Sequence, residues 1–332
     1  MSFMERHQVA LYLGSMIAGV ACAGLSGWSH ASEQLVPYVL GALLWTNFAL
    51  MPLTGMSVGQ YKRLACAVVL AATFGTSILI APLVSLFIPE GGPVALAAVI
   101  VLLAPCVDYV VVFTRIAGGE YRGLLVATPY LLAAQLIFIP IWTSIYACIG
   151  ILDMRVVGEI FPIPTESYLS LTPLILPLVA AYLAQRWSTR SPQRRQAYER
   201  VRSMSDTAMI PLMCLLLALM CSAYTPAVLN ETQLIPRLAG LYLTYAILAG
   251  VAAWFLSRAM SRTERISVTF SVTRNALIIY PVVALCAQRL AHNGNPEAKL
   301  MSATVLPQTL TELLIMVAMT AIFRAAFQDR KN

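Results

Sequence analysis

Three ionisable side chains lie inside long apolar segments of this chain, where lipid disfavours charge. They are Asp108, Arg274 and Glu312. An intramembrane charge is costly and usually faces a bundle interior, a water-filled cavity or a substrate path. Arg274 could pair with Asp108, with Glu312, or with each in turn, and a carboxylate whose cationic partner comes and goes can bind and release protons. The alternative is a structural buried ion pair with one protonated acid.

Two of these charges stand beside predicted interruptions of helices. Pro105 lies near the centre of an apolar stretch, where proline removes a backbone donor and clashes with the preceding turn. A second stretch is interrupted near its centre at Thr273–Asn275. A half-helix that begins after such a break offers free N–H groups to an anion or an oxygen-rich solute. A simple kink at Pro105 is the other interpretation.

Cys106 is the only cysteine at a predicted break beside an acid, Asp108. A cysteine at a helix N-terminus is favoured as the thiolate, and thiolates prefer soft ions. We therefore predict Cys106 as a ligand for a thiophilic metalloid solute, and no resident metal site. The other cysteines are expected to be small apolar core residues.

The elements that must hold these residues are membrane helices. Of the 332 residues, 59% are hydrophobic and 11% are charged, whereas soluble domains carry about 25% charged residues. A span needs ~20 mostly apolar residues, and continuous runs of this length favour helices over strands. We predict an all-α integral membrane protein with ten transmembrane helices at residues 8–26, 35–55, 64–88, 93–116, 121–148, 168–186, 207–225, 236–257, 266–290 and 299–323.

The basic residues predict the topology. With the N-terminus inside, 17 lysines and arginines fall in cytoplasmic segments, four fall outside, and Arg274 stays in the membrane. This positive-inside bias predicts a multi-pass protein of the plasma (inner) membrane with both termini cytoplasmic. Arg6 and His7 before the first run also resemble a signal peptide, but the topology works better if this run is kept as a span. The net charge of +7 is spread between apolar runs and does not indicate nucleic-acid binding.

The spans divide into two five-helix halves that we predict to be inverted repeats, 1–149 and 150–332, within a single membrane domain. The second half opens with an acidic outer loop, 150–167, and contains a basic cytoplasmic loop, 187–206. The interruptions at Pro105 and Thr273 then fall in spans four and nine, the fourth of each half. Matching interruptions in the two halves point to a transporter binding site.

The stretch Ala104–Thr114 resembles the arsenite-efflux permeases (arsenical resistance transporters) of the bile acid/arsenite/riboflavin transporter superfamily. The similarity extends through Arg115–Gly119, Thr273–Asn275 and Leu306–Glu312, where Pro307 is expected to loosen span ten. Chain length and span number agree, so the resemblance covers nearly the whole chain. It implies a core domain and a panel domain, spans four and nine broken and crossing at mid-membrane, and secondary transport by alternating access.

The resemblance also implies roles for individual residues. In the arsenite branch a cysteine in span four and a glutamate in span ten matter for transport, and the matching residues are Cys106 and Glu312. The sodium-coupled bile-acid branch carries Glu and Gln before an Asn in span nine. Phe270 and Arg274 take those positions here and only Asn275 remains. An arginine repels sodium, so proton coupling is favoured.

The chain departs from the pattern at two positions beside Cys106. Val107 and Tyr109 stand where some relatives carry Thr and Trp. The solute can therefore differ from arsenite.

Three functions stay open at this stage. The first is proton-coupled efflux of arsenite or a similar trivalent metalloid, with Cys106, Asp108 and Asn275 binding the solute, and Glu312, Asp108 and Arg274 coupling protons. The second is a proton- or sodium-coupled organic-anion transporter, since Arg274 suits a carboxylate. A non-transporting membrane sensor is least favoured. No Gly-x-x-x-x-Gly-Lys loop is present, so no ATPase is built in. We expect no enzyme activity and no cofactor. The partners expected are solute, protons and lipid, with a homodimer left open.

Overall fold

The computed structural model describes residues 7–25, 28–51, 53, 58–104, 110–160, 172–230, 233–272 and 276–328. Within these ranges every regular element is a helix and no strand occurs. The chain forms two compact units, which we call unit 1 (Met1–Met56 and Leu171–Thr232) and unit 2 (Ser57–Ser170 and Gln233–Asn332). Each unit therefore takes residues from both predicted halves of the sequence.

Several helices are long and apolar enough to be embedded in a membrane. Four described helices pass this test by length and composition, and α8 adds a fifth if its bent arms count as one span. In an apolar solvent a helix satisfies its backbone groups internally, which explains the exclusive use of helices in a chain of this composition. The protein is thus a helical, membrane-embedded protein.

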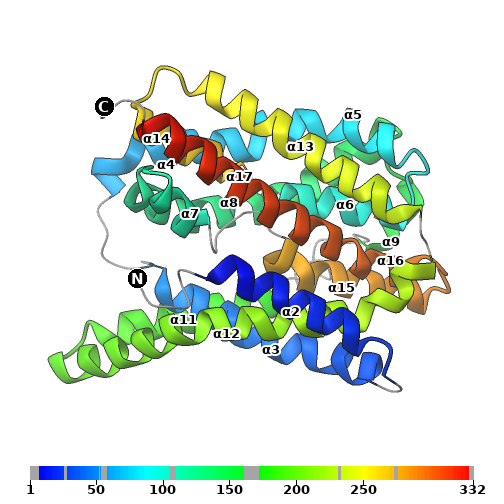
Figure 1. The fold of residues 1–332 in the computed structure, drawn as a ribbon, viewed down its shortest axis with the longest axis horizontal. Coiled ribbons are helices and arrows are strands. Elements are labelled where there is room, and N and C mark those ends of the chain that lie inside the picture. Colours follow the sequence, from blue (N-terminus) through cyan, green and yellow to red (C-terminus); the bar gives the residue numbers. More distant parts are fainter. Residues whose placement is uncertain are drawn as a thin grey trace. The chain divides into compact units, whose positions relative to one another are not determined.

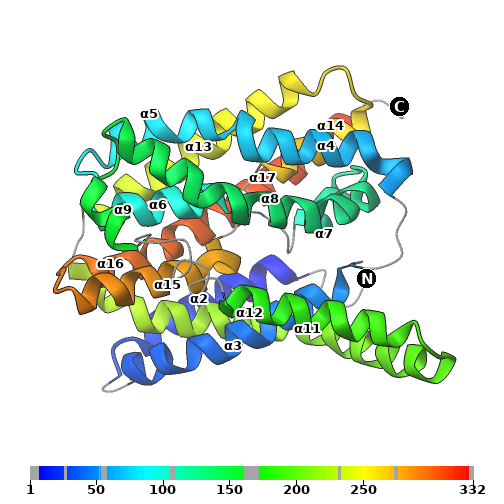
Figure 2. The same cartoon turned by 180° about the vertical axis from the view of Figure 1, so that it is seen from behind.

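The described part of unit 1 is a group of four helices. They are α2 (Gln8–Cys22), α3 (Trp28–Leu50), α11 (Thr172–Ser188) and α12 (Pro192–Asn230). The long helix α12 packs against α2 and α3, and α11 packs against α3 and α12 (Figures 1 and 2).

Small residues bring these helices close together. At Gly19 of α2, a Cβ atom would lie 2.3 Å from the backbone oxygen of Ala218 on α12, so only glycine fits. Ser32 of α3 donates a hydrogen bond of 3.3 Å to the buried hydroxyl of Ser222 on α12. Close backbone approach at small residues is a common way for membrane helices to associate.

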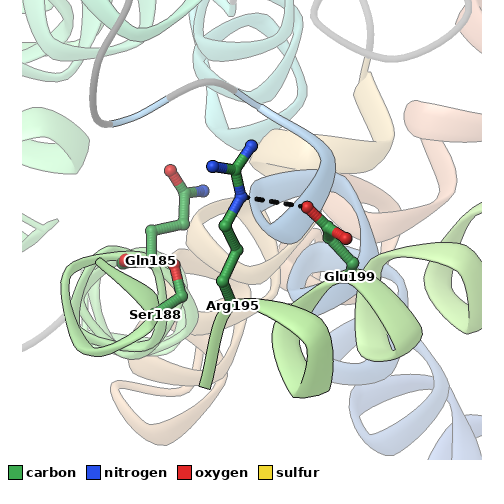
Figure 3. Close-up of polar contacts among 4 residues, drawn as sticks. All are labelled: Gln185, Ser188, Arg195 and Glu199. Atoms are coloured by element: carbon green, nitrogen blue, oxygen red, sulfur yellow. Dashed lines mark hydrogen bonds and ion pairs between the residues drawn. The ribbon is translucent and has the colours of Figure 1, made fainter. Parts of the chain in front are cut away.

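The predicted basic loop 187–206 is wrong as a loop, because most of it is helical. α11 continues to Ser188 and α12 begins at Pro192. Ser191 accepts a hydrogen bond from the backbone N–H of Arg194 at 3.3 Å, and proline is favoured in the first helical turn. The polar residues that follow form the first turns of α12, where Arg195 pairs with Glu199 at 3.1 Å (Figure 3).

Gln185 near the end of α11 holds the end of α3. Its side-chain nitrogen donates to the backbone oxygens of Phe48 at 3.4 Å and Met51 at 2.8 Å. Its side-chain oxygen accepts from the N–H of Leu53 at 3.0 Å. Ser188, one turn later on α11, bonds the Gln185 backbone oxygen at 2.6 Å (Figure 3). The buried Gln185 amide thus satisfies backbone groups that the end of a helix leaves open.

Unit 2 contains the remaining described helices. The elements of its first part are η1 (Val58–Tyr61), α4 (Lys62–Leu70), the π-helix η2 (Ala71–Gly75), α5 (Ser77–Phe87), α6 (Pro93–Leu103), α7 (Val110–Ile116), α8 (Tyr121–Cys148) and α9 (Met154–Ile160). Those of its second part are α13 (Leu234–Leu256), α14 (Arg262–Ser271), α15 (Ala276–His292), α16 (Ala298–Ala303) and α17 (Val305–Gln328).

The helix α6 forms the core of unit 2. Every residue from Pro93 to Leu103 is buried, which is typical of a helix that is apolar on all sides. α6 packs against α5, α8, α9, α15 and α16. Because α6 is packed on all sides, its last residue, Leu103, lies in the interior of unit 2.

The predicted outer loop 150–167 is also partly helical. It contains α9, whose Val156, Val157 and Ile160 are buried. The N–H of Asp153 donates to the backbone oxygen of Gly91 at 2.8 Å, which ties the segment after α8 to the start of α6. The apolar residues between the acids were the sequence signal for this short amphipathic helix.

We predict that Gly19→Ala destabilises unit 1. The added methyl group collides with the backbone of Ala218, which cannot rotate away, so α2 and α12 must separate at a cost of roughly 1–3 kcal/mol. Gly14→Ala on the same helix is the matched control, since no atom lies within 4 Å of its Cβ position. Thermal unfolding in detergent should show a lower Tm for Gly19→Ala than for Gly14→Ala. Equal Tm values would contradict the close approach.

Candidate functional site

Most of the sequence-predicted site residues lie outside the described residues. Pro105, Cys106 and Asp108 fall in 105–109, and Thr273, Arg274 and Asn275 fall in 273–275. Glu312 is the predicted site residue that the structure describes. The site is therefore built from Glu312 and from the helices that lead to and from these two segments.

The helix α6 ends where the sequence predicts an interruption. Its last residue is Leu103, and Ala104 is extended, with φ −66° and ψ 147°. The residue before a proline is pushed towards this conformation by the proline ring. The next described residue after the gap, Val110, begins α7. A helix that ends inside the core of unit 2 leaves backbone carbonyl groups without intrahelical partners.

The two interrupted stretches run side by side in unit 2. α6 packs against α15, and α7 packs against α14. Gly119, just after α7, has the side chains of Ile266 and Ser267 of α14 within 3.1 Å of its Cβ position, so a larger residue would push the two elements apart. The N–H of Glu120 also donates to the backbone oxygen of Thr263 at 3.1 Å. The described half-helices thus flank both interruptions.

Glu312 lies on α17, which packs against α7, α13, α15 and α16. Its side chain is buried, with 4% of the residue exposed. Gln308, one turn earlier on α17, donates a hydrogen bond of 3.1 Å from its side-chain nitrogen to a Glu312 carboxylate oxygen. A buried carboxyl group needs such donors, because an isolated charge in a low-dielectric interior is costly.

A small cavity adjoins the Glu312 side chain. Its volume is about 20 Å³, which is room for one water molecule. Residues of three helices, α6, α13 and α17, line it: Leu102, Tyr242, Tyr245, Ala246, Gln308, Thr311, Glu312 and Ile315. Leu102 is the second-last residue of α6, so the cavity beside the carboxyl group lies at the end of α6. The buried acid therefore lies close to the last turn of α6.

The helices α16 and α17 meet shortly before Glu312. Thr304 separates α16 from α17, and its backbone oxygen accepts a hydrogen bond of 3.3 Å from the Tyr242 hydroxyl. Pro307, which the sequence predicts as helix-loosening, lies in the first turn of α17, where its missing N–H costs nothing. The boundary between α16 and α17 therefore falls at Thr304, ahead of Pro307.

Sequence reasoning missed the neutral polar residues around Glu312. Gln308 stands four residues before Glu312, the spacing at which helical side chains meet, and this signal was readable in the sequence. Tyr242 and Tyr245 belong to α13, and no local pattern links that helix to α17. Gln135 of α8 was also missed, although a buried amide near the centre of a span is an equally visible signal.

The described part of the chain holds no group of three His, Cys, Asp or Glu side chains arranged to bind a metal ion. The Glu312 carboxylate accepts a hydrogen bond from the Gln308 amide, and Glu312 lines a small cavity. This arrangement can hold a proton, a water molecule or a polar solute group.

We predict that Gln308→Leu destabilises unit 2, because it leaves the buried Glu312 carboxyl group without this donor. The free energy of unfolding should fall by about 1.5–3 kcal/mol, the contribution of a hydrogen bond to a charged group. In the Gln308→Leu, Glu312→Leu double variant the two losses should be less than additive. Thr309→Val is the control, since its hydroxyl bonds the Val305 backbone oxygen. Tm values in detergent give the comparison, and additive losses would show that the two side chains act independently.

Comparisons with known proteins give no relative for this chain. No protein-family model matches it, and no curated protein matches it.

Proposed function

We propose that this protein is a secondary active transporter that exports arsenite, or a similar trivalent metalloid, in exchange for protons. The observation that carries the proposal is the buried Glu312 carboxyl group, which adjoins a cavity at the end of α6. An ionisable group at membrane depth is functional by default. A proton-binding acid beside an interrupted helix suits coupled transport of a polar solute.

The proposed architecture has ten spans in two inverted five-helix repeats. Described helices overlap each of the ten predicted segments. Unit 1 takes the helices of the first two predicted spans of each half, α2 and α3 with α11 and α12, and unit 2 takes the other described helices. Such matched sharing supports a repeat whose copies interlock, with unit 1 as the panel and unit 2 as the core. We place both termini in the cytoplasm and the protein in the plasma (inner) membrane, on the charge bias of the sequence.

The proposed mechanism uses one site in turn from the two sides of the membrane. A metalloid from the cytoplasm lies beside Cys106, whose sulfur contacts the soft central atom without displacing a hydroxyl group, and Asp108 and Asn275 contact the hydroxyl groups. Proton binding from outside at Glu312 or Asp108 changes the pairing of the acids with Arg274. The carrier then returns, and the proton leaves into the cytoplasm. No cofactor and no covalent catalysis are involved, so the protein is not an enzyme in this proposal.

The main rival is an organic-anion carrier of the bile-acid type. Arg274 and the start of α15 would suit a carboxylate. This rival requires Arg274 for binding and gives Cys106 no role. The two proposals therefore differ in which single substitution abolishes transport.

We predict that everted membrane vesicles containing the protein accumulate arsenite when their interior is made acidic. The Cys106→Ser, Glu312→Gln double variant should lose this uptake, because it lacks both the thiol and the titrating acid. Cys66→Ser is the matched control, since Cys66 is an exposed cysteine of α4. Radiolabelled or mass-spectrometric arsenic counts give the readout. Wild-type uptake by the double variant would refute the assignment.

A second prediction separates protons from sodium and arsenite from organic anions. Replacing sodium by choline should leave arsenite uptake unchanged, and a protonophore should abolish it, because Arg274 repels sodium. The rival predicts that Arg274→Ala abolishes taurocholate uptake while Cys106→Ser is tolerated. Sodium-dependent uptake of either solute would overturn proton coupling.

A further inference from the structure

Gln135 of α8 is a buried amide without a hydrogen-bond partner. The residue is 2% exposed, and neither its side-chain nitrogen nor its side-chain oxygen is bonded. Gln185 and Gln308, which are also buried, both use their amides. An unpaired buried amide costs about 1–3 kcal/mol by protein mutational data, so such a group needs an explanation.

The position of Gln135 along α8 matches the interruption of span four. The bond between Asp153 and Gly91 places the end of α8 and the start of α6 at one level. From that level α6 runs ~15 Å to Leu103, and α8 runs ~20 Å back to Gln135, at ~1.5 Å per residue. Gln135 therefore lies ~5 Å beyond the level of Leu103, the last residue of α6.

The helices α7 and α8 place Gln135 similarly when they are followed from the short connection between Ile116 and Tyr121. α7 rises ~9 Å from Ile116 to Val110, and α8 rises ~21 Å from Tyr121 to Gln135. Along the direction of α8, Gln135 thus lies between the level of Val110, where α7 starts, and the level of Leu103, where α6 ends. α8 packs directly against both helices. The amide is on the buried side of α8, together with Leu131, Ile139 and Thr143.

The helix also bends at this point. The arms Tyr121–Gln135 and Ile137–Cys148 meet at 45°. Pro140 accounts for the bend, because its ring displaces the bond to the carbonyl four residues earlier. The bend and the unpaired amide therefore fall together beside the interruption.

We infer that Gln135 is a solute-contacting residue of the transport site, which hydrogen-bonds hydroxyl groups of the solute through its amide. The inference rests on the proposed function. Arsenous acid is neutral and carries three hydroxyl groups, each both a donor and an acceptor. An amide offers one group of each kind, so it matches a hydroxylated solute better than it matches an anion, which only accepts.

Stability and transport should respond to Gln135 in opposite directions. Gln135→Met keeps the volume of the side chain and removes an unpaired polar group, so Tm should be unchanged or higher. The KM for arsenite in everted vesicles should rise at least tenfold. Gln135→Asn, which keeps the amide, should restore part of the affinity. Gln185→Met is the control for a structural glutamine, and it should lower Tm without a tenfold change in KM.

The outcomes separate this inference from the proposed function. If the wild-type protein does not transport arsenite, the proposed function fails. If the wild-type protein transports arsenite and Gln135→Met has the same KM, the role of Gln135 is overturned. A lower Tm with unchanged KM would make Gln135 a structural residue and would also overturn it.

Discussion

A helix that stops inside the core of a membrane-embedded unit leaves backbone groups that lipid cannot satisfy, and unit 2 is built around this constraint. α6 is buried along its whole length and ends at Leu103, with Ala104 extended. Only protein groups, water or solute can serve polar atoms at such a depth. The Glu312 carboxyl group and the Gln135 amide both lie at the level of that end. Their burial is reasonable only next to an interruption that needs polar partners.

The division into units follows from the same constraint. Unit 1 holds uninterrupted helices that meet at small residues such as Gly19 and through its buried polar pair, Ser32 and Ser222. Unit 2 holds both interrupted stretches and the buried acid. Close helix packing therefore characterises the described part of unit 1, and polar groups beside helix ends characterise unit 2.

Much of this could be predicted from the sequence, because apolar length and proline act locally. The helical membrane class and the end of α6 before Pro105 follow from such local rules. The polar, basic composition of residues 187–206 predicts a cytoplasmic loop, but composition alone does not distinguish a loop from a polar helix. Ser191 and Pro192 are instead a helix start, which local capping rules could have identified. The contact of Glu312 with a cavity lined by α13 was not predictable, because it depends on packing between distant helices.

The three buried glutamines of the described ranges differ in how their amides are used. Gln185 bonds three backbone groups at the end of α3, so its burial stabilises the fold. Gln308 donates a hydrogen bond to Glu312, so its amide serves a buried acid. The Gln135 amide forms no hydrogen bond, so the free-energy cost of burying it is not offset within the described protein. A polar group that the fold leaves unpaired at the level of a helix interruption is available to a ligand, because binding restores what folding omitted. In the transporter that we propose, the unpaired Gln135 amide would thus be a source of affinity for a hydroxylated solute.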